Sequence, residues 1–461
     1  MVRIFSHYFP LGTLCLVAMD AACLFISLVS GLSFVFVEES RPFLDAIPSA
    51  IVAVSVMLLF AGAFGLYNNN SHEKLWPVAP RFSVPLVLGL PLLHWFFYRL
   101  PDGAISLQAV ATTVMMIIVG RLAIFSISAA APAFINRRVM ILGVGADAAM
   151  VHETLERSRV PGLYFVGFYS LDADPTLTAN LPANRILLPS RTITDTARML
   201  KVNEIIIATR ERRGGVLPLG ELLDCKLKGI KVIDLSSFYE TYKSKVRIDL
   251  LRESWFIFGD GFRQGRSRMF VKRAFDIIAS SVLLVLSMPI LLIAAIAIKL
   301  ESAGPVIYRQ ERVGLGGRPF NVLKFRSMRA DAEKDGQPQW AQAGDARVTR
   351  VGLLMRLTRI DELPQLITVL AGQMSLVGPR PERQFFVDQI VQKVPFYAAR
   401  HSVKPGVTGW AQVRHHYGAS VDDASDKLEY DLFYVKNHTL LFDILILFYS
   451  VRVVLLAQGS R

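Results

Sequence analysis

Charged residues are scarce in this chain, and cysteine is scarcer still. Charged side chains make up 19% of the 461 residues, where a soluble protein carries nearer 25%. Three cysteines occur, Cys15, Cys23 and Cys225, without the spacing of a zinc site or a disulfide framework. No Gly-Lys-Ser/Thr phosphate loop is present, which excludes a P-loop nucleotide hydrolase. Because 52% of the residues are hydrophobic, part of the chain is expected to lie in a membrane.

The charge that is present is strongly unbalanced towards the positive sign. The formal net charge is +13 at pH 7, which suits nucleic acid, an anionic membrane surface or an anionic substrate. Long apolar runs make the membrane the expected partner. We therefore predict anionic lipid and phosphate as partners of the basic residues, and no nucleic acid.

Four apolar segments occupy the first part of the chain, at about residues 11–37, 47–66, 82–98 and 104–127. Each has about the length that a membrane-spanning helix requires. The distribution of basic and acidic residues between them places the N-terminus and everything after residue 136 in the cytoplasm. Residues 1–135 are therefore predicted to form a four-helix transmembrane region.

Residues 136–250 alternate between short apolar runs and helix-like stretches, which predicts a Rossmann-like parallel sheet. The first strand leads into Gly143 and Gly145, and Ala148 completes a dinucleotide-binding fingerprint. Asp172 and Asp174 are the candidates for the acidic residue that should end the second strand. A small-residue turn that packs a helix on a strand, without any nucleotide, is the favoured alternative.

A fifth apolar run, residues 277–298, is long enough to cross the membrane but contains Pro289 in its middle. Four earlier spans have already returned the chain to the cytoplasm, and a fifth would export everything that follows. Basic residues flank the run on both sides. We therefore predict a re-entrant helix with its hinge at Ser287 and Pro289, and a kinked spanning helix is the alternative.

The candidate for chemistry is an acidic pair, Asp361-Glu362, which follows Arg356 and Arg359. Adjacent carboxylates beside fixed cations suit phosphate chemistry, because one can attack or bind a metal while the arginines neutralise phosphate oxygens. In the alternative interpretation, Asp361 merely caps the N-terminus of a helix that begins at Glu362.

Three basic segments accompany the acidic pair. Residues 304–333 include Lys324 and Arg326, a Gly-Pro-Arg-Pro turn contains Arg380, and a later glycine-rich segment contains Arg414. Residues 304–333 lie between a membrane element and the carboxylate pair, which predicts a phosphate site at the membrane surface, and a solvated basic face is the alternative.

Residues from about 268 to 461 resemble the bacterial sugar transferases that load a polyprenyl phosphate with a sugar phosphate. Six blocks in the same order carry the resemblance: KRAFDIIAS, GPVIYRQERVG, FNVLKFRSM, RIDELPQL, MSLVGPRPE and KPGVTGWAQV. With the four apolar segments and the Rossmann-like unit, the chain is similar to the long-form undecaprenyl-phosphate glucose or galactose transferases of exopolysaccharide loci. The resemblance implies a monotopic α/β catalytic domain with a re-entrant helix over residues 266–461.

The resemblance also implies a covalent mechanism. Asp361 would attack the sugar-bearing phosphate of a UDP-hexose and expel UMP, and Glu362 would bind Mg²⁺. Undecaprenyl phosphate would then take the sugar phosphate from the aspartate. The family often has an Asn-Gly-Arg turn where this chain has Arg-His-His-Tyr, so Arg414 is assigned in place of the missing arginine. The implied phosphate-binding residues are Lys324, Arg326, Arg380 and Arg414.

The implied location is the bacterial inner membrane, with the catalytic domain on the cytoplasmic face and homodimerisation left open. Two other functions remain as alternatives. The first is a membrane-tethered NAD-dependent sugar-nucleotide oxidoreductase or epimerase, for which the Tyr239 to Lys243 segment offers an imperfect signature. The second is a non-enzymatic scaffold for polysaccharide export. Which UDP-hexose is used, the prenyl length and the ligand of the Rossmann-like unit are not determined by the sequence.

Overall fold

The computed structural model describes residues 137–157, 163–171, 181–187, 191–209, 217–258, 261–262, 265–329, 345, 347–415 and 421–455, with short stretches before residue 60. The chain divides into two compact units, and the main boundary lies between Lys243 and Ser244. The four apolar segments predicted to span the membrane fall almost wholly outside the described residues. Their number and topology therefore stay predictions.

The first unit is built on a five-stranded sheet in which every strand is parallel to its neighbours. Its three central strands hold the buried hydrophobic residues, as expected for a sheet that is covered on both faces. The predicted parallel sheet is thereby confirmed. The strands, in order across the sheet, are β5 (Ile186–Leu187), β4 (Leu163–Tyr169), β3 (Arg137–Leu142), β6 (Glu204–Ile207) and β7 (Lys231–Asp234).

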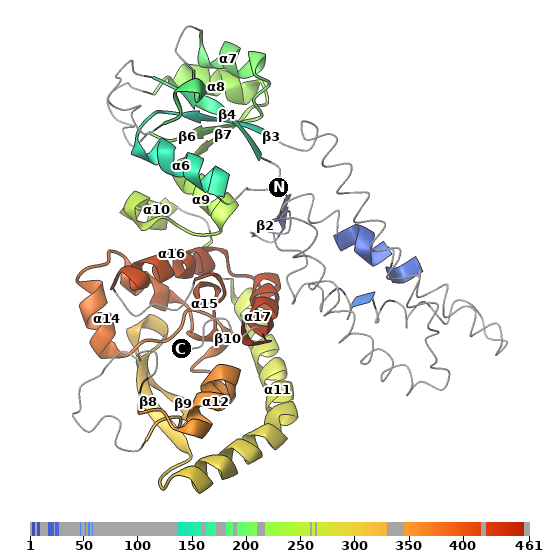
Figure 1. Ribbon diagram of the computed structural model, residues 1–461, viewed down its shortest axis with the longest axis vertical. Helices are drawn as coiled ribbons and strands as arrows, with labels where there is room; N and C mark the ends of the chain where they lie inside the picture. Colours follow the sequence, from blue (N-terminus) through green and yellow to red (C-terminus); the bar gives the residue numbers. More distant parts are fainter. Residues whose placement is uncertain are drawn as a thin grey trace, which may run out of the picture. The chain divides into compact units, whose positions relative to one another are not determined.

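Helices cover both faces of this sheet (Figure 1). Helices α6 (Ala146–Arg157) and α9 (Leu235–Lys243) lie on one face, and α7 (Ile193–Met199) and α8 (Leu219–Leu227) lie on the other. The α7–α8 side encloses an apolar core that includes Cys225, which is fully buried and free.

The glycine turn after β3 is explained by local packing. Gly143 has a φ of +117°, and a Cβ there would lie 2.9 Å from Thr209 Cγ2 and 3.2 Å from the Ala208 carbonyl oxygen. Only glycine tolerates that backbone conformation and that approach. This is the packing role proposed as the alternative to nucleotide binding. Asp172 and Asp174 lie outside the described residues.

The tyrosines of the oxidoreductase-like segment serve the packing of α9. Tyr239 is 3% exposed, and Tyr242 donates a 2.7 Å hydrogen bond to Glu204 Oε2. Glu204 is fully buried and also accepts from Lys231 Nζ at 2.9 Å. Burial and the neighbouring Glu204 carboxylate raise the pKa of Tyr242 above its ordinary value. Both tyrosines of the segment are therefore explained by their place in the fold, Tyr239 by burial and Tyr242 by its contact with Glu204.

The second unit mixes helices with two small sheets, an antiparallel hairpin β8–β9 and a parallel pair β10–β11. Its apolar core lies around Trp410, Phe433 and Phe442. The elements are α10 (Glu253–Phe258), α11 (Arg266–Glu301), β8 (Ile307–Val313), β9 (Pro319–Phe325), α12 (Arg350–Thr358), α13 (Gln365–Leu370), β10 (Ser375–Val377), α14 (Gln384–Val391), β11 (Gly406–Thr408), α15 (Trp410–Arg414), α16 (Val421–Asn437) and α17 (Leu440–Leu455), with short 3-10 turns between some of them.

Helix α17 is apolar along most of its sequence. One of its faces belongs to the core, because Phe442 and Ile446 are buried there. Asp443 is fully buried and pairs with Lys272 of α11 at 2.6 Å. Leu441 and Val451 are exposed on the remaining surface.

Helix α11 is, within the described part of the chain, the one helix long and apolar enough to cross a membrane. Large apolar side chains along it are exposed, including Ile278, Leu286 and Ile293 at 64–70%. Pro289 lies inside the helix and cannot donate the main-chain hydrogen bond expected at its position. Figure 1 shows α11 running beside α17 and then turning towards β8.

Both ends of α11 are attached to the same unit. Near its N-terminus, Arg273 donates to the carbonyl oxygens of Val369 and Leu370 at 2.6 and 2.7 Å. At its C-terminus, Glu301 accepts from the backbone N–H of Arg350 at 2.7 Å. A straight helix of 36 residues would be about 54 Å long, well beyond the roughly 30 Å of a hydrocarbon core. A bent helix with both ends on one unit favours the re-entrant prediction over a spanning helix.

The re-entrant arrangement predicts that both ends of α11 are accessible from the same side of the membrane. Single cysteines would replace the exposed Arg266 and Ala303 in a variant whose three native cysteines are serine. A membrane-impermeant maleimide should then label both sites in inverted vesicles and neither in right-side-out vesicles. Labelling of the two sites from opposite sides would show that α11 crosses.

Candidate functional site

The acidic pair lies in a short 3-10 turn, Ile360–Glu362, that links α12 to α13. Arg359 begins the turn in the left-handed conformation, with φ 60° and ψ 16°, which a residue with a side chain adopts at some cost in energy. The capping interpretation of Asp361 is wrong, because Asp361 lies inside this turn and Pro364 occupies the N-cap position of α13. The pair is therefore placed by a strained connection between two helices.

Helix α12 is held at its start by two caps. The Thr349 hydroxyl accepts from Gly352 N at 3.0 Å, and the Glu301 carboxylate accepts from Arg350 N and Val351 N. A Cβ on Gly352 would lie 2.1 Å from the Ser327 carbonyl oxygen, so glycine lets α12 pack directly on the segment that follows β9. This packing brings the acidic pair next to the hairpin.

Three cations surround the Glu362 carboxylate. Lys324 Nζ from β9 lies 3.2 Å from Oε1, and Arg380 Nη2 from the loop after β10 lies 2.8 Å from the same oxygen. Arg359 Nη1 lies 3.6 Å from Oε2. Burial raises the pKa of Glu362, but Arg380, Lys324 and Arg359 together outweigh burial and hold it well below its usual range. Glu362 is therefore a fixed negative charge.

Asp361 has the opposite environment. It is 7% exposed, and its Oδ1 has no hydrogen-bond partner among the described residues. Burial, followed by the adjacent Glu362 charge, raises the pKa of Asp361 to about 6, although Lys324, Arg356 and Arg380 act in the other direction. Two neighbouring carboxylates thus have pKa values pushed apart, an arrangement that gives them different chemical roles.

The site is suited to a metal only if a substrate completes it. The described residues contain no group of three or more His, Cys, Asp or Glu side chains placed to bind a metal. Mg²⁺ commonly takes one or two carboxylates and fills its coordination with substrate phosphates and water. Glu362, a fixed negative charge, would supply such a carboxylate, and its Oε2 has a longer contact of 3.6 Å with Arg359.

Two of the predicted phosphate-binding arginines have other contacts. Arg326 is buried and donates to the carbonyl oxygens of Ser302 and Ala303 at 2.8 and 2.9 Å, at the end of α11. Arg414 lies over the ring of Trp410, with Cζ 5.1 Å from the centroid. The structure thus brings Lys324 and Arg380 to the acidic pair. The Nη1 and Nη2 groups of Arg326 instead bind carbonyl oxygens at the end of α11. A phosphate role for Arg326 and Arg414 stays a prediction.

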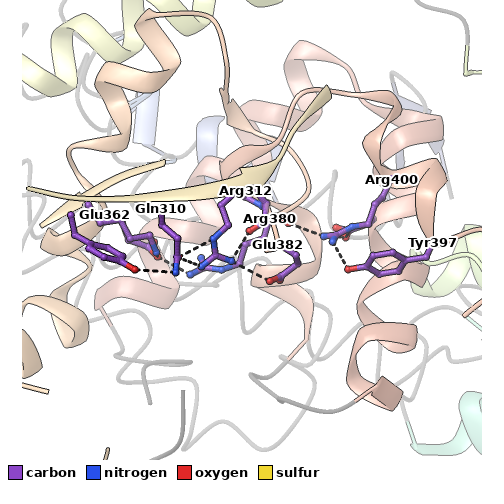
Figure 2. Close-up of polar contacts among 11 residues, drawn as sticks. Gln310, Arg312, Glu362, Arg380, Glu382, Tyr397 and Arg400 are labelled. Carbon is purple, nitrogen blue, oxygen red and sulfur yellow. Dashed lines mark hydrogen bonds and ion pairs between the residues drawn. The ribbon is translucent and has the colours of Figure 1, made fainter. Parts of the chain in front are cut away.

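Sequence reasoning did not identify the polar network behind Arg380, which Figure 2 shows. Its members include Arg312 of β8 and the buried residues Tyr397, Arg400 and Asp431. In the sequence, a buried arginine looks the same as a solvated one. Asp431 gives no signal either, because α16 carries several other acidic and basic residues along its length.

Comparison with known proteins assigns the second unit to one family. Residues 267–457 match the family described as bacterial sugar transferase. A UDP-N-acetylgalactosamine-undecaprenyl-phosphate N-acetylgalactosaminephosphotransferase of Aeromonas hydrophila is 46% identical over 240 residues, which are 52% of this chain and 56% of that protein.

Two further relatives carry related names. A UDP-glucose:undecaprenyl-phosphate glucose-1-phosphate transferase of Caulobacter vibrioides is 46% identical over 182 residues, which are 39% of this chain and 68% of that protein. A protein of the same name from Xanthomonas campestris is 32% identical over 336 residues, covering 69% of this chain and 66% of that protein. The chain thus spans little more than half of the Aeromonas relative and two thirds of these two.

The opposite environments predict opposite effects of neutralising the two carboxylates. The pKa of Asp361 is higher in the folded chain than the unperturbed 3.8, so its ionisation opposes folding above about pH 6, and this cost disappears below pH 3.8. Asp361→Asn should therefore stabilise the fold at pH 7.5, by up to about 3 kcal/mol, with a smaller gain at pH 5. Glu362→Gln should destabilise it, because three cations lose their partner. Thermal unfolding in detergent measures both variants, and a destabilising Asp361→Asn at pH 7.5 would contradict the unfavourable burial of the Asp361 carboxylate.

Proposed function

Because the chain belongs to the bacterial sugar transferase family, we propose that it transfers a sugar 1-phosphate from a UDP-sugar to undecaprenyl phosphate. The observation that carries the proposal is the buried pair Asp361-Glu362, in which one carboxylate is neutralised by Lys324 and Arg380 and the other keeps an unpartnered oxygen. The product, a sugar attached to undecaprenyl diphosphate, would be the first lipid-linked unit of an exopolysaccharide.

In the proposed first step, Asp361 Oδ1 attacks the phosphorus that carries the sugar. The bond from that phosphorus to the bridging oxygen of the diphosphate breaks, and UMP leaves with the electron pair. The unpartnered oxygen and the raised pKa of Asp361 support this role, because a poorly solvated carboxylate is a better nucleophile than a hydrated one.

In the proposed second step, a phosphate oxygen of undecaprenyl phosphate attacks the same phosphorus. The acyl-phosphate bond to Asp361 breaks and the free carboxylate returns. One site then performs two displacements, each with a similar distribution of negative charge. Phosphoryl transfer depends chiefly on positioning and on neutralisation of that charge.

Lys324 and Arg380 are the cations placed to neutralise the transferring phosphate. Both already lie within 3.2 Å of Glu362 Oε1, so phosphate oxygens arriving there would share donors that the chain has positioned in advance. Glu362 would hold Mg²⁺ together with the diphosphate, and Mg²⁺ when bound would offset charge on the departing UMP. Glu362 also fixes the two cations while no substrate is present.

The acceptor is a lipid whose phosphate lies at the membrane surface. Helix α11 exposes apolar side chains along much of its length, while its C-terminal end caps α12, the helix that leads into the acidic pair. A helix that enters one leaflet and returns would hold the site at the depth of the lipid phosphate. We propose that this site lies on the cytoplasmic face of the inner membrane, where it would have access to a UDP-sugar dissolved in the cytoplasm.

The sugar is not determined by the family, because relatives named for N-acetylgalactosamine and for glucose are both similar to this chain. A panel of UDP-glucose, UDP-galactose and UDP-N-acetylgalactosamine with undecaprenyl phosphate would identify the donor by UMP release. Absence of UMP release with every donor would support a non-enzymatic scaffold. A homodimer stays a prediction.

Asp361→Asn is expected to abolish transfer while the protein stays folded, because an amide cannot form the acyl-phosphate bond. The rate of UMP release should fall by about 10³-fold or more. Asp388→Asn is the matched control, since Asp388 is exposed on α14 of the same unit and lies outside the site. Near-normal turnover of Asp361→Asn would show that this residue is not the nucleophile.

The raised pKa of Asp361 predicts an acid limb in the pH profile of kcat/KM. Protonated Asp361 cannot attack, so the rate should be constant above about pH 6 and fall about tenfold per pH unit below it. An ordinary aspartate would place this limb nearer pH 4. A profile that stays flat down to pH 4.5 would contradict the buried, unpaired environment described for Asp361.

A further inference from the structure

The arginine that reaches the acidic pair lies on a loop with few main-chain donors. We call residues 378–382, Gly-Pro-Arg-Pro-Glu, the proline loop. Pro379 and Pro381 have no N–H, so hydrogen bonds can hold this backbone chiefly through its carbonyl oxygens. Arg380 lies between the two prolines, and its Nη2 lies 2.8 Å from Glu362 Oε1.

Each of four successive carbonyl oxygens in the proline loop accepts a hydrogen bond. Two of the donors are main-chain groups: Gly406 N reaches the Pro379 oxygen at 3.0 Å, and Val313 N reaches the Glu382 oxygen at 2.9 Å. The other two donors are side chains. Arg400 Nη2 reaches the Arg380 oxygen at 2.9 Å, and Arg312 Nη1 reaches the Pro381 oxygen at 3.2 Å.

Arg400 is itself fixed in place by its neighbours. It is 5% exposed, its Nε and Nη2 lie 3.0 and 2.7 Å from Asp431 Oδ2, and its Nη1 donates to the Tyr397 hydroxyl at 2.7 Å. Asp431 and Tyr397 are also buried. Because Asp431 and Tyr397 fix the planar guanidinium of Arg400, its Nη2 group is directed at the carbonyl oxygen of Arg380 (Figure 2).

Arg312 approaches the loop from the hairpin. Its Nε and Nη2 lie 3.0 and 2.5 Å from Gln310 Oε1, and its Nη1 also lies 3.4 Å from Glu382 Oε2 (Figure 2). Arg312 lies in β8, and Arg400 lies in the 3-10 turn Tyr397–Ser402. From these two elements they bind consecutive carbonyl groups of the proline loop.

We propose that Arg312 and Arg400 are positioning residues that clamp the proline loop through its carbonyl oxygens and so aim the Arg380 guanidinium at the acidic pair. This inference rests on the proposed transfer reaction for its kinetic consequence. The clamp acts through Arg380 and touches neither substrate nor the attacking aspartate. A misplacement of about 1 Å at such a site costs up to about 10²-fold in rate.

A double-mutant cycle on the full-length protein separates the clamp from general stability. Arg312→Met and Arg400→Lys should each lower kcat/KM for UMP release by about 10–100-fold, and Arg400→Lys keeps a charge opposite Asp431. In an Arg380→Gln background the same changes should cost less than about threefold, because the residue they position is gone. Arg309→Met is the control, since Arg309 is exposed and lies on the opposite face of β8 from Arg312.

The pH profile gives a second readout that loss of stability alone would not move. Arg380 is one of the cations that lower the pKa of Asp361, so a displaced Arg380 should shift the acid limb of both clamp variants to higher pH. Arg309→Met should keep the wild-type limb. The proposal would be overturned if each clamp variant lowered kcat/KM by the same factor with and without Arg380→Gln and left the acid limb at its wild-type pH.

Hydrogen exchange measured by mass spectrometry tests the clamp without any turnover. Peptides that cover the proline loop should exchange faster in Arg312→Met than in wild type or Arg309→Met, and unchanged exchange would also overturn the proposal. If wild type releases no UMP with any donor but the loop exchanges faster in Arg312→Met, the proposed function fails while the clamp stands.

Discussion

The second unit depends on burying two adjacent carboxylates, Asp361 and Glu362, with enough positive charge for only one of them. An ionised carboxylate is costly to remove from water unless it is paired, and Glu362 is paired with Lys324, Arg359 and Arg380. Asp361 shares the burial but has an oxygen without a partner. This imbalance supports the proposal that the turn is a reactive centre and not merely a buried ion pair.

Much of the surrounding architecture maintains that imbalance. Lys324 comes from a hairpin strand, Arg359 from the strained start of the turn, and Arg380 from a loop whose carbonyl oxygens are held by two further arginines. The end of α11 caps α12, so the candidate membrane helix and the acidic turn are directly connected. In the proposed reaction, a phosphate that enters this site would meet Arg380, whose loop is itself held by contacts with Arg312 and Arg400.

The first unit shows a different use of polar groups. Glu204, Lys231 and Tyr242 form a polar contact across β6, β7 and α9, in which the buried Glu204 carboxylate accepts from both partners. Likewise, Gly143 is required by a close approach of the backbone to Thr209. Both features resemble enzyme motifs in the sequence, but their contacts explain them through packing.

The sequence by itself determined the parallel sheet, the apolar length of α11, the acidic pair and the family, because these depend on local periodicity and on ordered short motifs. Through the resemblance it also named Lys324 and Arg380 as cations of the site, and the structure brings both to Glu362. Only the tertiary structure decided that Asp361 lies within a 3-10 turn and does not cap a helix, that Arg326 binds the end of α11, and that Arg312 and Arg400 hold the loop of Arg380. The physical reason is that an arginine's role depends on which acceptors the fold brings within reach, and those acceptors lie tens of residues away in the chain.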